Sequence, residues 1–232
     1  MPFDDKPLFI EFSKLNKNII IWGVGCGGTI PNKLYNYISN SIFSCCRDKT
    51  SLQRVLKVKP DAFLIPDPMF LTSIVTENKK VNGITMSCNL ELNKNYSEKF
   101  KGNIYNIISQ TMKKIGGKWI AIPATISKNL SVPSSGYSDN DNKCHYKLQK
   151  YFPELEICEF ENFDQITDKI VHLDTYISSR LHTGVVAVGY GVSTVYFGHE
   201  KMGWMVNSWN IPDIYSGAVS YTHLTLPTKR IV

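Results

Sequence analysis

The chain has 232 residues, of which 43% are hydrophobic and 20% charged, and its formal net charge is +6. This length fits one large domain or two small ones, and the apolar share supplies a buried core, which excludes global disorder. Basic residues are scattered along the chain, which argues against a nucleic-acid-binding surface and is compatible with a small anionic substrate.

The first part of the chain alternates between short apolar runs and amphipathic segments. Asp48 or Thr50 is a suitable cap for a helix, and Pro66-Asp67-Pro68 breaks the series. The polar passage between 68 and 83 predicts a linker, so we expect a first domain over 1–75. The predicted elements are a strand over 18–23, a helix over 33–39, a strand over 42–46, a helix over 51–57 and a strand over 62–65.

The same alternation continues from residue 83 to residue 209. Helical spacing places Phe163, Ile166 and Ile170 on the inward face of one helix. The predicted strands cover 83–87, 118–123, 154–158, 175–178 and 193–197, and the predicted helices cover 98–115, 145–151, 163–172, 181–190 and 202–209. Such alternation predicts an α/β fold with parallel sheets and helices on both faces, in two lobes, the second over 76–218.

Residues 219–232 differ in composition from the rest of the chain, since they contain no acidic residue and show no helical period. Back-translated as GTC TCT TAT ACA CAT CTG, residues 219–224 resemble the transposase adapter of short-read sequencing libraries. We interpret 219–232 as a non-native tail, exclude it from fold reasoning and expect it to pack irregularly.

Neither a membrane span nor a metal site is expected. No apolar run approaches the ~20 residues that a spanning helix needs, and no signal peptide follows Met1. We therefore expect the protein in the cytoplasm, either free or at the inner face of the membrane. The six cysteines form no Cys-x-x-Cys and no zinc-type Cys/His grouping, so we expect reduced, mostly buried thiols, no metal and no cofactor.

The glycine-rich segment after the first strand has the spacing Gly-x-Gly-x-x-Gly, from Gly23 to Gly28. A dinucleotide-binding fingerprint would lead straight into a helix and be followed by an acid about twenty residues on, and neither feature is present. We therefore predict a tight turn that lets the backbone pass close to a ligand or to a neighbouring loop.

Arg47 and Asp48 lie between a predicted strand and a predicted helix, where open α/β sheets bind their ligands. Two readings stay open here. The first is a binding site that uses Arg47, and the second is a surface ion pair with Asp48 as the helix N-cap.

The strongest candidate site is the segment from Ser178 to Gly184, between an apolar strand and an apolar helix. Arg180 and His182 would emerge at the carboxyl edge of the sheet, beside a helix N-terminus. A guanidinium and a helix dipole hold anions, and an imidazole moves protons near neutral pH. The alternative is a structural role for both, with Arg180 in an ion pair. Lys201 follows the next strand and could reach the same cleft, or be solvated.

The chain resembles the polysaccharide pyruvyl transferase family at Tyr176-Ile-Ser-Ser-Arg-Leu-His-Thr-Gly, since family members carry a Ser-x-Arg-x-His segment before a helix of small residues. Three further features occur in the family's order. They are the early glycine-rich strand end, the Arg47-Asp48-x-x-Ser51 segment followed by Asp67-Pro68, and Lys201 followed by Trp204 and Asn210-Ile-Pro-Asp213.

The resemblance implies a fold of two Rossmann-like lobes, similar to the GT-B glycosyltransferases. Its first lobe would bind a saccharide acceptor, lipid-linked or nucleotide-linked, and its second lobe phosphoenolpyruvate. It implies transfer of pyruvate as a ketal in bacterial exopolysaccharide biosynthesis, with His182 as proton carrier and Arg47, Arg180 and Lys201 as anion ligands. Family members usually carry a further strand and helix at the start and further helices at the end, so we expect a fragment lacking both.

Two other functions stay open. The same scaffold serves nucleotide-sugar glycosyltransferases and epimerases, since a fold does not fix a function. A non-catalytic binding protein descended from an enzyme is the other alternative.

Overall fold

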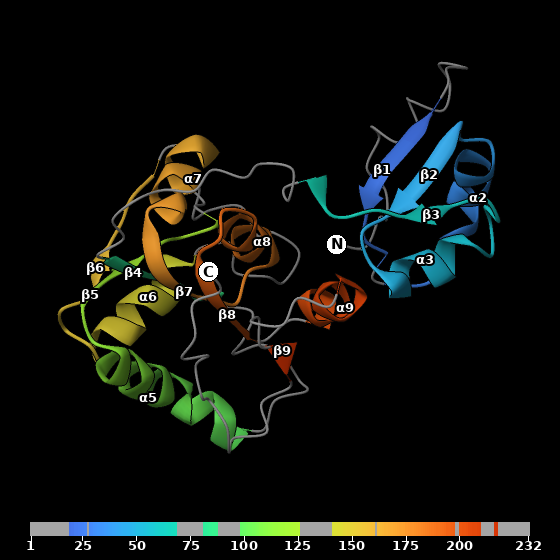
Figure 1. Ribbon diagram of the computed structural model, residues 1–232. Coiled ribbons are helices and arrows are strands. Elements are labelled where there is room, and N and C mark those ends of the chain that lie inside the picture. The colour runs from blue at the N-terminus through green and yellow to red at the C-terminus, as the bar shows by residue number, and fades with distance from the viewer. Residues whose placement is uncertain are drawn as a thin grey trace, which may run out of the picture. The chain divides into compact units, whose positions relative to one another are not determined.

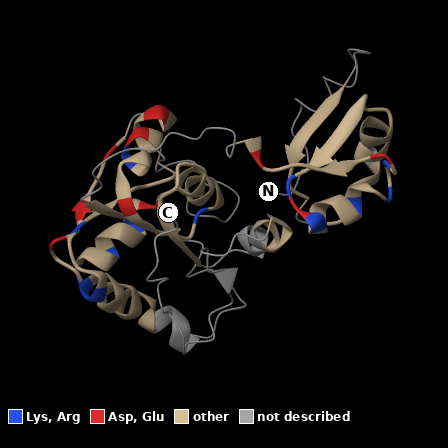
Figure 2. Ribbon diagram, in the orientation of Figure 1, with Lys and Arg blue, Asp and Glu red and all other residues tan. Residues whose placement is uncertain are grey.

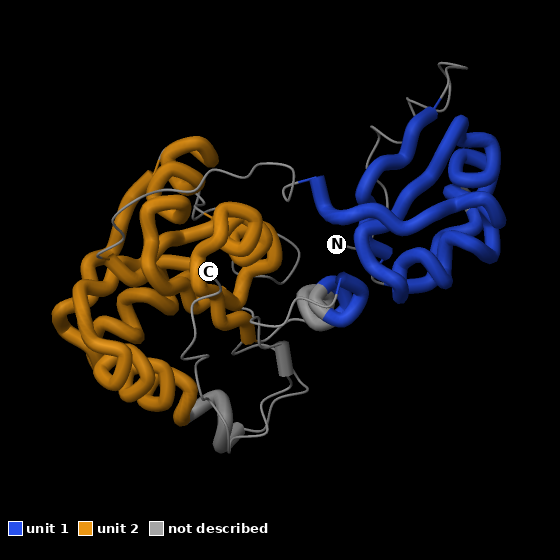
Figure 3. The backbone as a smooth tube through the Cα atoms, in the orientation of Figure 1, with its two compact units in different colours: residues 1–68, 204–210 blue, residues 69–203, 211–232 orange. Residues whose placement is uncertain are grey.

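A computed structural model describes residues 19–26, 28–68, 81–87, 98–125, 141–160, 162–197, 200–209 and 216–217 of the protein. The chain divides into two compact units (Figure 3). Unit 1 comprises residues 1–68 and 204–210, and unit 2 comprises residues 69–203 and 211–232. Residues 204–210 therefore pack with the start of the chain, far from them in sequence.

Unit 1 contains a parallel three-stranded sheet in the order β1-β2-β3 (Figure 1). Its elements are β1 (Ile20–Val24), α2 (Asn32–Ser39), β2 (Phe43–Cys46), α3 (Lys49–Val55) and β3 (Phe63–Leu64). A small core forms where Cys46 of β2 meets Val55 of α3 and Leu34 and Ile38 of α2. The side chain of Asp48 accepts a 2.7 Å hydrogen bond from the Ser51 backbone N–H, which fixes the start of α3.

Unit 2 contains a parallel six-stranded sheet in the order β6-β5-β4-β7-β8-β9 (Figure 1). Numbered along the chain within this unit, the order is 3-2-1-4-5-6, that of a doubly wound nucleotide-binding sheet. The strands are β4 (Val81–Thr85), β5 (Lys118–Ala121), β6 (Glu156–Ile157), β7 (Leu173–Ser178), β8 (Ser193–Phe197) and β9 (Ser216–Gly217). The helices of this unit are α5 (Glu98–Ile115), α6 (Asn142–Gln149), α7 (Phe163–Val171) and α8 (Leu181–Gly189). The last helix, α9 (Glu200–Trp209), belongs to unit 1 from residue 204 on.

Two hydrophobic cores lie on opposite faces of this sheet. Along β5, Trp119 and Ala121 enter the core that contains side chains of α5 and α6. Ile120 enters the core that contains side chains of α7 and α8. Because successive strand residues point to opposite faces, this alternation confirms that the sheet is covered on both sides.

The predicted α/β class with parallel sheets is confirmed, and α5 and β8 have the predicted bounds. The strand predicted over 83–87 instead covers 81–85, because the next two backbone N–H groups bond to side chains. Met86 donates to His145 and Ser87 donates to Ser179. The two-residue strand β9 was not predicted. The tail at 219–232 and the linker at 69–80 lie outside the described residues, so the domain boundaries at 75 and 218 stay predictions.

The inward orientation predicted for Phe163 is wrong. Ile166 and Ile170 are buried as predicted, whereas Phe163 is 48% exposed. Phe163 is the first residue of α7, so helical spacing alone does not bring it over the sheet.

Charges of both signs are interspersed in each unit (Figure 2). Lys113 and Lys114 lie in the last turn of α5, where cations interact favourably with the carbonyl end of a helix. Among the described helices, none combines the length and the apolar character needed to cross a membrane.

Candidate functional site

The candidate site of unit 2 lies where the strand order of its sheet reverses. β4 is the first strand of the sheet, and it pairs with β5 on one side and β7 on the other. In doubly wound sheets the connections from two such neighbours leave in opposite directions, which opens a crevice at the carboxyl ends of the strands. Arg180 follows β7 at this point, and Met86 and Ser87 follow β4.

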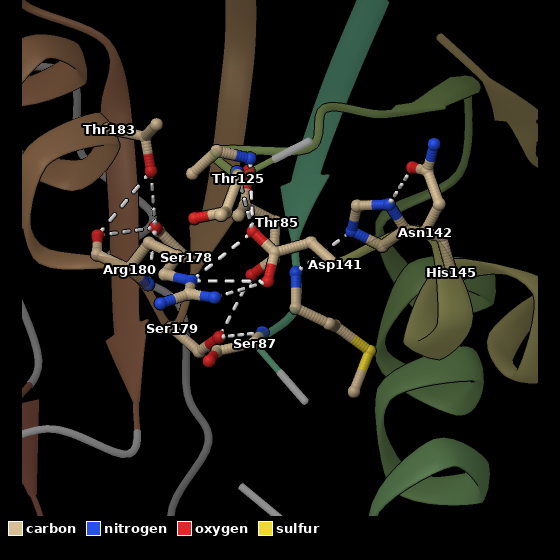
Figure 4. Close-up of polar contacts among 12 residues, drawn as sticks. Thr85, Ser87, Thr125, Asp141, Asn142, His145, Ser178, Ser179, Arg180 and Thr183 are labelled. Carbon is tan, nitrogen blue, oxygen red and sulfur yellow. Dashed lines mark hydrogen bonds and ion pairs between the residues drawn. The ribbon is translucent and has the colours of Figure 1, made fainter. Parts of the chain in front are cut away.

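The Arg180 guanidinium is held by the carboxylate of Asp141 (Figure 4). Arg180 Nη2 donates to Asp141 Oδ1 at 2.6 Å, and Nε lies 3.1 and 3.2 Å from the two carboxylate oxygens. This is a two-pronged, charge-assisted contact, the most specific geometry available to an arginine. The Arg180 side chain keeps 22% of its surface exposed, so it is only partly buried.

Asp141 is fully buried and also accepts hydrogen bonds from the chain that follows β5. The backbone N–H groups of Ala124 and Thr125 donate to its Oδ2 at 3.0 and 3.2 Å. Burial raises the pKa of Asp141 above its ordinary value. Arg180 and the two N–H donors act in the opposite direction, but the effect of burial is the larger. The carboxylate thus joins the end of β5 to the end of β7.

His145 of α6 is buried and neutral. Its Nε2 accepts a 3.0 Å hydrogen bond from the Met86 backbone N–H, and its Nδ1 lies 3.2 Å from Asn142 Oδ1 (Figure 4). An accepting Nε2 places the proton on Nδ1. Burial, followed by the Arg180 charge, lowers the pKa of His145 to about 3. His145 therefore fixes the chain after β4 and does not supply protons near neutral pH.

Ser179 ties the end of β7 to the end of β4. Its backbone N–H donates to the Thr85 carbonyl oxygen at 2.9 Å, and its hydroxyl accepts from the Ser87 N–H at 2.6 Å. Both serines are buried. Together with Asp141 and His145, Ser179 makes the carboxyl ends of β4, β5 and β7 one connected polar network.

A pocket of about 360 Å³ lies beside this network and is shared by Arg180 and His182. Its walls also include Phe163, Thr183 and Val186, and Ala124 and Thr125 of the chain after β5. His182 is an exposed residue in the first turn of α8, and the cap residue Arg180 makes no side-chain cap bond to that helix. An arginine, an imidazole and a helix N-terminus at one small pocket suit an anionic ligand that exchanges a proton.

Arg47 lies in unit 1, at the end of β2. Its Nη1 donates to Asp67 Oδ2 at 2.8 Å, and its carbonyl oxygen accepts a 2.7 Å hydrogen bond from Trp209 Nε1 of α9. Of the two readings of Arg47-Asp48, the N-cap role of Asp48 is confirmed, but Arg47 pairs with Asp67 and not with Asp48.

The glycine-rich segment makes the close turn that the sequence predicts. Gly23 has φ +60°, and a Cβ there would lie 2.7 Å from Cδ of Pro68, in the loop after β3. A Cβ at Gly25 would lie 2.9 Å from Nη2 of Arg47, so the guanidinium packs directly against the Gly25 backbone. The glycine-rich turn therefore passes close to the loop after β3, at Pro68, and to the side chain of Arg47.

The predicted site residues thus have different outcomes. Arg180 and His182 share one pocket, as expected from the strand-to-helix transition, and Arg180 also forms the ion pair that the alternative reading gave it. Lys201 belongs to α9, but its side chain lies outside the described residues, so its role and that of Arg47 beside the same ligand stay predictions. The sequence analysis missed Asp141 and His145. Their only signal was their position in the sequence, because Asp141 ends a long polar segment and His145 begins a predicted helix.

Within the described ranges, no group of three His, Cys, Asp or Glu residues could hold a metal ion.

A family model of polysaccharide pyruvyl transferases matches residues 2–201. This chain belongs to the polysaccharide pyruvyl transferase family. The family name implies a transferase, and the match includes every residue of the Arg180 network and its pocket.

No curated protein matches the chain. Among solved structures, the chain is similar to the "Crystal structure of accessory secretory protein 1,2 and 3 in Streptococcus pneumoniae", with 9% sequence identity and a TM-score of 0.46. The similarity covers 73% of this chain and 34% of that chain, so the chain spans about a third of the length of its match.

Proposed function

We propose that the protein transfers the pyruvate of phosphoenolpyruvate to two hydroxyls of a sugar, forming a ketal. The observation that carries the proposal is the shared pocket of Arg180 and His182, in a chain of the pyruvyl transferase family. Phosphoenolpyruvate carries a phosphate and a carboxylate, so its site needs fixed cations. Arg180, clamped by Asp141, is such a cation.

The reaction requires one proton to be moved to carbon. Protonation of the methylene carbon of phosphoenolpyruvate makes the neighbouring carbon cationic, and a sugar hydroxyl then adds to that carbon. The carbon–phosphate oxygen bond breaks, inorganic phosphate leaves, and the second hydroxyl closes the ketal. The two sugar hydroxyls lose two protons in all. One equals the proton that the new methyl group gains, and the other leaves with the phosphate.

His182 is the residue that we assign to this proton transfer. It is exposed at the pocket, unlike the buried His145, so its imidazole is within reach of a bound ligand and of solvent. Arg180 would hold the phosphate or the carboxylate and stabilise the charge that develops on departure of phosphate. Arg47 and Lys201 are assigned to the remaining negative charge of the ligand.

The test is acceptor-dependent turnover. The chain is incubated with phosphoenolpyruvate and a panel of lipid-linked and nucleotide-linked saccharides, and phosphate release and the mass of the saccharide are measured together. We expect equal amounts of phosphate and of a product that has gained a pyruvate ketal. Transfer of sugar from a sugar nucleotide, without use of phosphoenolpyruvate, would replace the proposal with a glycosyltransferase. Binding of phosphoenolpyruvate without turnover on any acceptor would favour a non-catalytic binding protein.

A further inference from the structure

We infer that Asp141 is the positioning residue of the pocket, which holds the Arg180 guanidinium so that one edge of it faces the anionic ligand. This inference rests on the proposed binding of phosphoenolpyruvate at Arg180. Asp141 acts through Arg180 and touches no ligand itself.

The geometry divides the Arg180 guanidinium into two parts. Nε and Nη2 donate to the Asp141 carboxylate, at distances of 2.6 to 3.2 Å. Nη1 makes no hydrogen bond to the described part of the chain, and in Figure 4 the guanidinium turns this nitrogen away from the carboxylate. Because the guanidinium is rigid and planar, fixing two of its nitrogens also fixes the direction of the third.

Asp141 itself is unable to bind a ligand. Its side chain has no exposed surface, and its two oxygens already accept from Arg180 Nε and Nη2 and from the N–H groups of Ala124 and Thr125. A carboxylate has about four acceptor positions, so these donors saturate it. Its effect on a ligand must therefore pass through Arg180.

The main chain of Asp141 is anchored independently of Arg180. Its N–H donates to the Thr125 carbonyl oxygen at 3.2 Å, and its own carbonyl oxygen accepts from the N–H groups of Cys144 and His145 at the start of α6. His145 in turn accepts from Met86 after β4. The carboxylate is thus held by two strand ends and one helix, a support of the kind that keeps a binding group within the narrow tolerance that tight binding needs.

Calorimetric titration of phosphoenolpyruvate into four forms of the full chain tests the inference. The forms are the unaltered protein, Asp141→Asn, Arg180→Lys and the double variant. Asn keeps the size of Asp but has no charge and only one acceptor oxygen, so it does not hold the guanidinium through two carboxylate oxygens. We expect Asp141→Asn to weaken phosphoenolpyruvate affinity roughly 10-fold to 100-fold, the scale of misplacing a binding group by about 1 Å.

The Arg180→Lys background separates positioning from general damage. A lysine has a single ammonium group, which pairs with either Asp141 or the ligand. We therefore expect Asp141→Asn to leave affinity unchanged or to increase it in that background. An equal loss of affinity in both backgrounds, or an Asp141→Asn variant that binds like the unaltered protein, would overturn the inference. Asp168→Asn, which removes an exposed carboxylate of α7, is the matched control and should bind normally.

The outcomes also separate this inference from the proposed function. Failure of the unaltered protein to bind phosphoenolpyruvate contradicts the proposed function before any variant is compared, and the role of Asp141 in that binding falls with it. Should circular dichroism show that Asp141→Asn is unfolded, Arg180→Lys alone carries the test. Arg180→Lys keeps the positive charge but loses the planar, two-pronged guanidinium. The affinity of this variant for phosphoenolpyruvate should therefore fall about 10-fold or more, and an unchanged affinity would overturn the inference.

Discussion

Arg180 Nη2 lies 2.6 Å from Asp141 Oδ1, although the two residues are 39 positions apart in the sequence. The contact joins the end of β7 to the start of α6. It places a partly exposed cation against a fully buried anion, and so both the stability of unit 2 and the charge of the pocket depend on one ion pair.

Removal of Arg180 should destabilise the protein. Arg180→Ala leaves the buried Asp141 carboxylate without its charge partner, and breaking such a pair costs about 3 kcal/mol or more. Urea denaturation should show this loss, and Asp141→Asn in the same background should restore part of it, since no buried charge remains. The exposed pair of Lys118 and Glu156 has the same 2.6 Å separation and is the control, because its removal should have little effect.

The same variant should lose stability as the pH rises. Without Arg180, burial still raises the Asp141 pKa, opposed only by the N–H donors of Ala124 and Thr125, and keeps it above that of the unfolded chain. Between the two pKa values the folded state binds more protons than the unfolded state, so the free energy of unfolding decreases with pH. Denaturation of Arg180→Ala over a range of mildly acidic pH checks the sign. A decrease that persists in Arg180→Ala/Asp141→Asn would show that Asp141 is not its source.

Acid should destabilise the unaltered protein through His145. The pKa of this residue is about 3 when folded and 6.5 in its ordinary state, so below pH 6.5 the unfolded chain binds a proton that the folded chain does not. Stability from this residue is complete above pH 6.5 and declines toward pH 3, by up to about 1.4 kcal/mol per pH unit. His145→Gln can still accept from Met86 but does not titrate, and its stability should vary less with pH. Identical pH profiles of the two proteins would contradict the prediction.

His182→Ala should separate turnover from binding. We expect kcat to fall about 10²-fold to 10⁴-fold, the usual contribution of a general acid, while phosphoenolpyruvate affinity stays close to that of the unaltered protein. Steady-state kinetics with calorimetry measure the two quantities. The exposed His172, at the end of α7, is the matched control, and His172→Ala should keep full turnover. A His182→Ala variant with normal kcat would remove His182 from the mechanism.

Phe163→Glu should weaken phosphoenolpyruvate binding. Phe163 is 48% exposed and lines the pocket with Arg180 and His182, so a carboxylate there would repel an anionic ligand. We expect an affinity about 10-fold lower, less so at high salt. Phe163→Leu, which adds no charge, should bind almost normally. Equal binding by both variants would place the ligand away from this wall of the pocket.

The fold was largely predictable because each helix and strand has its own pattern along the chain. The spacing of Tyr105, Ile108 and Met112 predicts α5, and those side chains are buried. The position of Arg180 between a strand and a helix predicts a place at the carboxyl edge of the sheet. Both inferences need only residues that are close together in the sequence.

Asp141 and His145 were not predictable in this way, because their roles depend on which strands are neighbours. Asp141 contacts Arg180 only because β4 alone separates β5 from β7 in the sheet. Nothing in the residues around Asp141 specifies that order. Phe163 illustrates the same limit, since its spacing fits the buried face of α7 but its position at the first turn leaves it at a pocket.

The central claim is that phosphoenolpyruvate binds at Arg180 and His182, and protection of His182 from chemical modification tests it most directly. The chain is treated with diethyl pyrocarbonate, and the rate at each histidine is followed by peptide mass spectrometry, with His172 as the internal control. We predict that phosphoenolpyruvate slows modification of His182 but not of His172, and that a sugar nucleotide slows neither. Protection of His182 by the sugar nucleotide, with no effect of phosphoenolpyruvate, would contradict the account.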